Sequence, residues 1–155
     1  MAPQVKPIPE GYHSITPYLI VDGAASAIEF YKMVFGATER FRMPAPGGRV
    51  GHAEISVGDS IVMLADENLE SHAHGPRHYK GSPISMMLYV EDVDAVFASA
   101  IAAGASVRRP VSDQFYGDRL GMFEDPFGHV WAVATHTEDV SPEETEKCAA
   151  AAHPA

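Results

Sequence analysis

The chain has 155 residues, of which 46% are hydrophobic and 21% charged, a composition typical of a compact globular protein with its own core. Its formal net charge of −10 at pH 7 argues against nucleic acid as a partner, because nucleic-acid binding needs a basic surface. With no long apolar run, no secretory signal and Cys148 as its single cysteine, the sequence predicts a cytoplasmic protein that has no disulfide and binds no membrane.

The first half of the chain predicts a strand, a helix and three further strands. Residues 14–21 mix β-branched and aromatic residues and end at a turn, which predicts a strand after an N-terminal extension of residues 1–13. Apolar residues then recur at steps of three and four, which predicts a helix from Ala24 that ends at Gly36. Three more strands are predicted at residues 41–43, 49–57 and 60–65. Residues 14–65 are therefore predicted to form a βαβββ unit.

The second half repeats this order after a polar connector, residues 66–83. Residues 84–90 predict a strand, and a helical stripe follows from Val93 to the stop at Gly104. Strands are then predicted at residues 107–110, 119–124 and 129–135, so residues 84–136 form a second βαβββ unit. In the tail, residues 137–155, the sequence SPEE at 141–144 predicts the start of a short appended helix.

The two halves also repeat in sequence. Residues 15–22 (ITPYLIVD) return as residues 84–91 (ISMMLYVE), an offset of 69 residues. The glycine that ends each predicted helix returns with an offset of 68 residues. A repeat of this length predicts two similar units, and we expect any functional site to lie in a cavity that they share.

Three short motifs resemble a known superfamily. Residues 21–31 (VDGAASAIEFY) resemble the start of the first helix in the glyoxalase/bleomycin-resistance/extradiol-dioxygenase superfamily, the vicinal oxygen chelate proteins. Residues 116–121 (YGDRLG) and 125–131 (DPFGHVW) resemble its PhnB-like branch. The resemblance covers about residues 15–135 and implies an α+β fold, in which two tandem βαβββ units form a curled mixed-sheet cup. It also implies a homodimer and, in many members, a divalent metal beside a small substrate.

The positions at which the resemblance implies metal ligands carry other residues in this chain. Metal-dependent members place His or Gln near the start of each unit's first strand and Glu on its last strand. The matching positions hold Thr16, Ser85, Ala132 and either Met63 or Leu64. None of these side chains competes well for Zn²⁺, Ni²⁺ or Fe²⁺, so we predict no metal cofactor.

Strand alternation selects further side chains for the cup, because successive residues of a strand point to opposite faces. It groups Tyr18 with Thr16, and Met87 and Tyr89 with Ser85. On the strand at 49–57 it separates the apolar residues from His52 and Glu54, which then face the cup. An imidazole beside a carboxylate in an apolar pocket could act as an acid/base pair. The alternative is a solvated pair at the rim of a half-exposed sheet.

Tyr116 and Arg119 are further candidates, because they lie where a loop enters a strand and such places often present binding groups. The guanidinium of Arg119 suits a carboxylate or a phosphate. The alternative for Arg119 is structural, namely an ion pair with Asp118 or Asp125 that holds the loop.

Three classes of function stay open at this level. The missing metal ligands favour a protein that binds a small aromatic or amphipathic molecule. The residues expected to line that site are Thr16, Tyr18, Ser85, Met87, Tyr89, Tyr116, Arg119 and Ala132. The alternative is a lyase, isomerase or dioxygenase-type enzyme that uses His52 and Glu54 as acid/base groups or replacement metal ligands. A third is an interaction protein that has kept the fold and lost the site.

Overall fold

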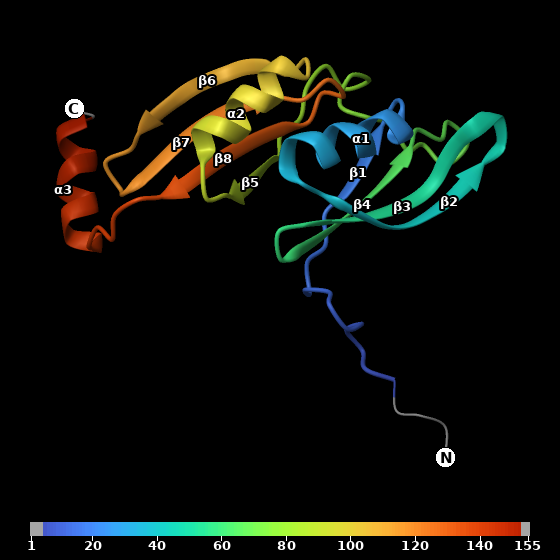
Figure 1. The fold of residues 1–155 in the computed structure, drawn as a ribbon, viewed down its shortest axis with the longest axis horizontal. Helices are drawn as coiled ribbons and strands as arrows, with labels where there is room; N and C mark the ends of the chain where they lie inside the picture. Colours follow the sequence, from blue (N-terminus) through green and yellow to red (C-terminus); the bar gives the residue numbers. More distant parts are fainter. Residues whose placement is uncertain (1–4, 153–155) are drawn as a thin grey trace. The chain divides into compact units, whose positions relative to one another are not determined.

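The computed structural model describes residues 5–152, and the chain divides into two units, Met1–Gly81 and Ser82–Ala155 (Figure 1). Each unit holds one four-stranded mixed sheet with a helix packed against it, so the fold is α+β. The order of elements is βαβββ in both units, as the sequence predicts.

The first unit orders its strands β1-β4-β3-β2, with β1 parallel to β4 and the other pairs antiparallel. A short 3-10 turn at Pro46–Gly48 joins β2 to β3. The elements are β1 (Tyr18–Val21), α1 (Ala24–Phe35), β2 (Thr38–Ala45), β3 (Arg49–Val57) and β4 (Ser60–Asp66).

The core of the first unit lies between α1 and one face of its sheet. On β3, Ala53, Ile55 and Val57 are buried on this face, whereas the residues between them lie on the other face. Five of the six apolar residues in the predicted helix stripe are buried, Phe35 being half-buried, and Gly36, which has φ +64°, caps the C-terminal end of the helix. The other face of this sheet, here called the open face, carries Tyr18, Phe41, His52, Glu54 and Met63.

The second unit orders its strands β5-β8-β7-β6, with β5 parallel to β8. Its core includes Phe123, which packs edge-on against Phe97 at 5.9 Å between ring centroids, and the buried Trp131. The elements are β5 (Ser85–Tyr89), α2 (Val93–Ala102), β6 (Ser106–Asp113), β7 (Asp118–Glu124) and β8 (Val130–His136). The tail forms α3 (Pro142–Ala152), where Ser141 and Glu144 bond each other as a reciprocal N-terminal cap.

Two strands are longer than the sequence predicts. β2 and β6 run through Pro44 and Pro110, at which the sequence prediction ended or turned the chain. Both strands lie at the edge of their sheets and pair with a neighbour on one side only. Proline, which has no backbone N–H, is tolerated there because its missing hydrogen bond can fall on the unpaired side. The first strand is shorter than predicted, because regular pairing with β4 begins only at Tyr18.

Asp66, the last residue of β4, anchors α1. Its carboxylate accepts hydrogen bonds from the backbone N–H groups of Gly23 (2.8 Å), Ala24 (2.9 Å) and Val50 (2.7 Å). Burial raises the pKa of this carboxyl, but the three backbone donors outweigh burial and the pKa lies below its usual range. Asp66 is therefore an ionised group that ties the helix start to two strands.

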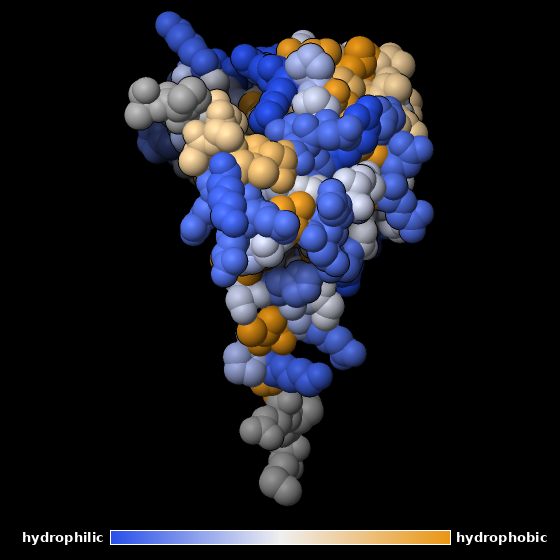
Figure 2. Space-filling model, turned by 90° about the vertical axis from the view of Figure 1, so that its left-hand side faces the viewer, coloured by the Kyte–Doolittle hydropathy of each residue, from blue (hydrophilic) through white to orange (hydrophobic). Residues whose placement is uncertain are grey.

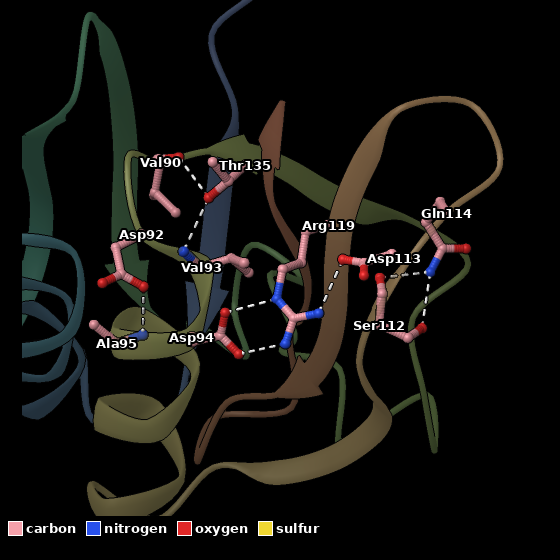
Figure 3. A network of polar contacts seen from close by, with 10 residues as sticks. All are labelled: Val90, Asp92, Val93, Asp94, Ala95, Ser112, Asp113, Gln114, Arg119 and Thr135. Atoms are coloured by element: carbon pink, nitrogen blue, oxygen red, sulfur yellow. Dashed lines mark hydrogen bonds and ion pairs between the residues drawn. The ribbon is translucent and has the colours of Figure 1, made fainter. Parts of the chain in front are cut away.

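Thr135 takes the same position in the second unit, 69 residues after Asp66. Its hydroxyl accepts from the N–H of Val93, the first residue of α2, and donates to the carbonyl of Val90, each at 2.9 Å (Figure 3). The repeat thus keeps a side-chain anchor at the start of each helix although the residue type differs.

The face drawn in Figure 2 is mostly hydrophilic, with apolar residues gathered in a few places. This agrees with a composition of 21 acidic and 11 basic residues. Within residues 5–152, no helix is both long enough and apolar enough to cross a membrane.

Candidate functional site

Strand pairing identifies the first-unit residue that corresponds to Ala132. Tyr18 pairs with Met63, and Met87, 69 residues after Tyr18, pairs with Ala132. The counterpart is therefore Met63, on the open face, whereas Leu64 is buried on the α1 side.

The four positions of the implied metal site do not fit a divalent cation. Thr16 and Ser85 offer hydroxyls, Met63 a thioether and Ala132 a methyl group. In the part of the chain that the structure describes, no three His, Cys, Asp or Glu side chains lie together in a way that could hold a metal ion. The side chains at these four positions therefore do not form a site for a catalytic metal ion.

His52 and Glu54 belong to a hydrogen-bonded chain on the open face of the first sheet. His52 Nδ1 lies 2.8 Å from the Tyr18 hydroxyl, and His52 Nε2 lies 3.3 Å from Glu54 Oε1. The second carboxylate oxygen, Oε2, accepts from the Tyr12 hydroxyl. The side chains of His52 and Glu54 are 20% and 15% exposed, so this pair is shielded from solvent more than a rim pair would be.

The hydrogen-bond partners indicate which atoms of Tyr18, His52 and Glu54 carry protons. A carboxylate can only accept, so the ring proton of His52 belongs on Nε2, and Nδ1 accepts from the Tyr18 hydroxyl. The Tyr12 hydrogen bond, helped by His52, holds the pKa of Glu54 below its usual range against the opposing effect of burial. The same bond raises the pKa of Tyr12, and burial raises that of Tyr18. At neutral pH, Glu54 is anionic and both tyrosines are neutral donors.

A groove with a volume of about 470 Å³ borders Glu54 in the first unit. Its walls are Pro7–Pro9, Tyr12–Ser14, Thr16, Glu54 and Met63. Phe41 pairs with Glu54 across β2 and β3, and this residue is 52% exposed. The groove therefore joins a carboxylate to a mainly apolar lining, with further aromatic surface next to it.

The sequence prediction missed three parts of this site. Tyr12 and one wall of the groove, Pro7–Pro9, lie within residues 1–13, which have no periodic pattern and were expected to be an extension. Phe41 could have been found, because strand alternation places it on the same face as Met43, which pairs with His52. Thr16, predicted from the resemblance, does line the groove.

The second sheet carries a separate polar chain at the ends of β5, β7 and β8. Tyr89 donates to Asp118 Oδ2 at 2.9 Å, and His136 Nδ1 lies 2.7 Å from Asp118 Oδ1. The other ring nitrogen of His136 lies 2.9 Å from Asp139 Oδ1. Bonds to Asp139 and Asp118 raise the pKa of His136, and both ring nitrogens can donate once the ring is protonated.

We expect His136 to titrate above its ordinary pKa of 6.5. Because the raised pKa belongs to the folded state, the stabilisation from this ring is complete below the unfolded pKa and is lost as pH rises through the folded one. An NMR titration of the ring protons tests this, and Asp139→Asn should bring the pKa down toward the ordinary value. A His136 pKa at or below 6.5 in the unmodified protein would contradict the assignment.

Arg119 lies on the α2 side of the second sheet, opposite to the face of Tyr89. Its guanidinium donates to both Asp94 oxygens at 2.7 and 2.8 Å and to Asp113 at 2.9 Å (Figure 3). Arg119 thus forms an ion pair, as its structural alternative predicts, but the expected partners Asp118 and Asp125 are wrong. Alternation along β7 points Asp118 to the other face, where it bonds Tyr89.

The remaining predicted residues stay in the second unit and are not brought into the groove. Ser85 and Met87 lie on the same face as Tyr89 and are exposed, whereas Ala132 is 7% exposed. The Tyr116 ring packs edge-on against Phe115 at 5.3 Å between centroids. The expectation of a cup shared by both units stays a prediction.

Comparison with known proteins agrees with the repeated fold. Residues 11–133 match the family model for the Glyoxalase/Bleomycin resistance protein/Dioxygenase superfamily. An uncharacterized protein of Mycobacterium bovis is 39% identical over 136 residues, which cover 86% of this chain and 90% of that protein. Protein PA1353 from Pseudomonas aeruginosa has a TM-score of 0.66 with 28% identity, over 81% of this chain and 99% of its own. The PhnB protein of Bacillus cereus shares the fold, with a TM-score of 0.63 at 19% identity over 79% and 99% of the two chains. This chain belongs to the glyoxalase/bleomycin resistance protein/dioxygenase superfamily, the superfamily that its sequence motifs resemble.

Proposed function

We propose that the chain binds a small aromatic or amphipathic molecule in the groove beside Glu54, without the metal that many members of the superfamily use. The observation that carries the proposal is the groove itself, about 470 Å³ in volume and walled by prolines, Ile8, Met63 and Tyr12 around one carboxylate. Ligand sites typically combine such an apolar lining with a few polar groups that orient the ligand. A PhnB-like protein that acts as a cytoplasmic homodimer is the wider proposal, and it rests on the sequence resemblance.

The exposed rings next to the groove support an aromatic ligand. Tyr18 and Phe41 are 49% and 52% exposed, although both lie on a sheet face beside a shielded His52–Glu54 pair. Both rings lie near the imidazole, with centroids 5.5 Å and 6.3 Å from that of His52. Large aromatic side chains left open beside a groove are suited to stacking against a ligand.

The second candidate is an acid/base enzyme, and the Tyr18–His52–Glu54–Tyr12 chain is the observation that favours it. The same hydrogen bonds, however, favour the binding proposal over the enzyme proposal. Both ring nitrogens of His52 and both oxygens of Glu54 already have partners inside the protein. His52 Nδ1 would have to give up its bond from the Tyr18 hydroxyl before it could take a proton from a substrate. If the protein converts a small molecule to a product and His52→Ala abolishes that activity, the result would favour the enzyme proposal over the binding proposal.

Titration with the uncharged fluorescent probe N-phenyl-1-naphthylamine tests the binding proposal. We expect saturable enhancement of its emission, unchanged after treatment with EDTA. Met63→Asp replaces an apolar wall of the groove with a second carboxylate and should weaken binding by about tenfold, or about 1.4 kcal/mol. Met33→Asp is the matched control, since Met33 is 69% exposed on α1, and it should bind like the unmodified chain. Equal binding by both variants, or a loss of binding in EDTA, would contradict the proposal.

A further inference from the structure

Among the described residues, Glu54 has hydrogen-bond partners but no lysine or arginine as an ion-pair partner. Its two carboxylate oxygens accept from the Tyr12 hydroxyl and from an N–H of the His52 ring. In the described range 5–152, no lysine or arginine forms an ion pair with this carboxylate. Its side chain is 15% exposed and borders the groove, so a ligand in the groove can reach a carboxylate that no lysine or arginine neutralises by direct contact.

The aromatic surface around Glu54 is also suited to a cation. Tyr12 bonds the carboxylate directly, Phe41 pairs with Glu54 across the strands, and Tyr18 bonds the adjoining imidazole. One ring already holds a cation, because the guanidinium of Arg40 lies 5.4 Å from the centroid of Tyr12. Ring faces attract ammonium and guanidinium groups, most strongly where water is excluded.

Arg40 does not neutralise the groove. It occupies the bulge between Glu39 and Phe41 on β2, is exposed, and is not among the residues that line the groove. Its field helps to keep Glu54 ionised, but the guanidinium makes no ion pair with that carboxylate. The side of Glu54 that borders the groove is left to a ligand.

Resting on the proposed function, we infer that the groove selects a cationic amphiphile, in which a primary amine or quaternary ammonium contacts Glu54 and an apolar or aromatic body lies along Met63 and the prolines. A carboxylate accepts hydrogen bonds but cannot donate them, so the complementary ligand group must donate or carry positive charge. An anionic ligand would meet both this carboxylate and a chain with a net charge of −10.

Three probes of equal length separate charge from shape: 4-phenylbutylamine, 4-phenylbutan-1-ol and 4-phenylbutanoate, measured by isothermal titration calorimetry at pH 7. We expect the amine to bind about tenfold tighter than the alcohol, and the carboxylate to bind weakest, since charge complementarity sets the order. Glu54→Gln keeps the shape and removes the charge, so it should make amine and alcohol equal. Glu70→Gln, at an exposed connector carboxylate, should keep the preference.

Tyr12→Phe supplies a second check if Glu54→Gln fails to fold by circular dichroism. It removes a neutral donor and leaves the charge, so the amine preference should survive. Equal binding of amine and alcohol by the unmodified chain would overturn charge selection, while leaving groove binding intact. A Glu54→Gln variant that still binds the amine more tightly than the alcohol would also overturn charge selection by Glu54 and leave groove binding intact. No binding of any probe would overturn the proposed function and this inference together.

Discussion

Asp66→Ala is expected to lower the free energy of unfolding by about 3–5 kcal/mol, because it leaves three backbone donors without their acceptor and each such buried donor costs roughly 1–3 kcal/mol. The donors belong to Gly23, Ala24 and Val50, and the Asp66 side chain is 8% exposed. Urea denaturation measures the loss. Amide hydrogen exchange should show faster exchange at the same three residues.

The repeat provides the control for this prediction. Thr135→Val removes two hydrogen bonds, one from the N–H of Val93 and one to the carbonyl of Val90, and should cost only about 1–2 kcal/mol. A loss in Asp66→Ala no larger than that in Thr135→Val would contradict the anchoring role. The pH dependence has a definite sign, since the folded pKa of Asp66 is lowered. Its stabilisation is present above the unfolded pKa and disappears as pH falls through the folded one, so the two proteins should converge in acid.

Gly117→Ala is expected to release the segment that follows β8 from the second sheet. Gly117 has φ +96°, and an added Cβ would lie 1.9 Å from the carbonyl oxygen of Glu138. The Gly117 carbonyl also accepts from the N–H groups of Thr137 and Glu138 and from the Thr137 hydroxyl. Losing these three hydrogen bonds and straining the turn should cost about 3–4 kcal/mol.

Hydrogen exchange at Thr137 and Glu138, together with limited proteolysis of the tail, measures this release. Gly36→Ala is the matched control, because Gly36 also has positive φ, +64°, but an added Cβ there meets no atom within 4 Å. It should cost only about 1 kcal/mol, the effect of the backbone conformation alone. The role of Gly117 would be refuted by a variant as mild as Gly36→Ala with normal protection of the tail.

Much of the fold could be predicted from local patterns. The spacing of apolar residues and the glycine stops located α1 and α2, and alternation assigned the two faces of β3. The edge strands β2 and β6 were predicted too short, because a proline ends a central strand but not an edge strand, and edge position depends on tertiary pairing.

Only the site residues that lie on a regular strand could be predicted. Alternation placed His52 and Glu54 on one face, and the repeat excluded the usual metal ligands at Thr16, Ser85 and Ala132. Tyr12 could not be found in this way, because an irregular segment reaches Glu54 through a contact 42 residues away in sequence. The Asp94 partner of Arg119, 25 residues away, likewise depends on how α2 packs on β7.

The measurement that tests the groove most directly is a titration of the ¹⁵N-labelled protein with 4-phenylbutylamine, followed by NMR chemical shifts. Ligand binding on the open face of the first sheet predicts saturable shifts at Tyr12, His13, Glu54 and Met63, which line the groove. With the uncharged 4-phenylbutan-1-ol as ligand, the shifts in Met63→Asp should be much weaker than those in the unmodified protein. Shifts confined to the second sheet around Met87 and Tyr89, or no saturable shifts at all, would contradict the account.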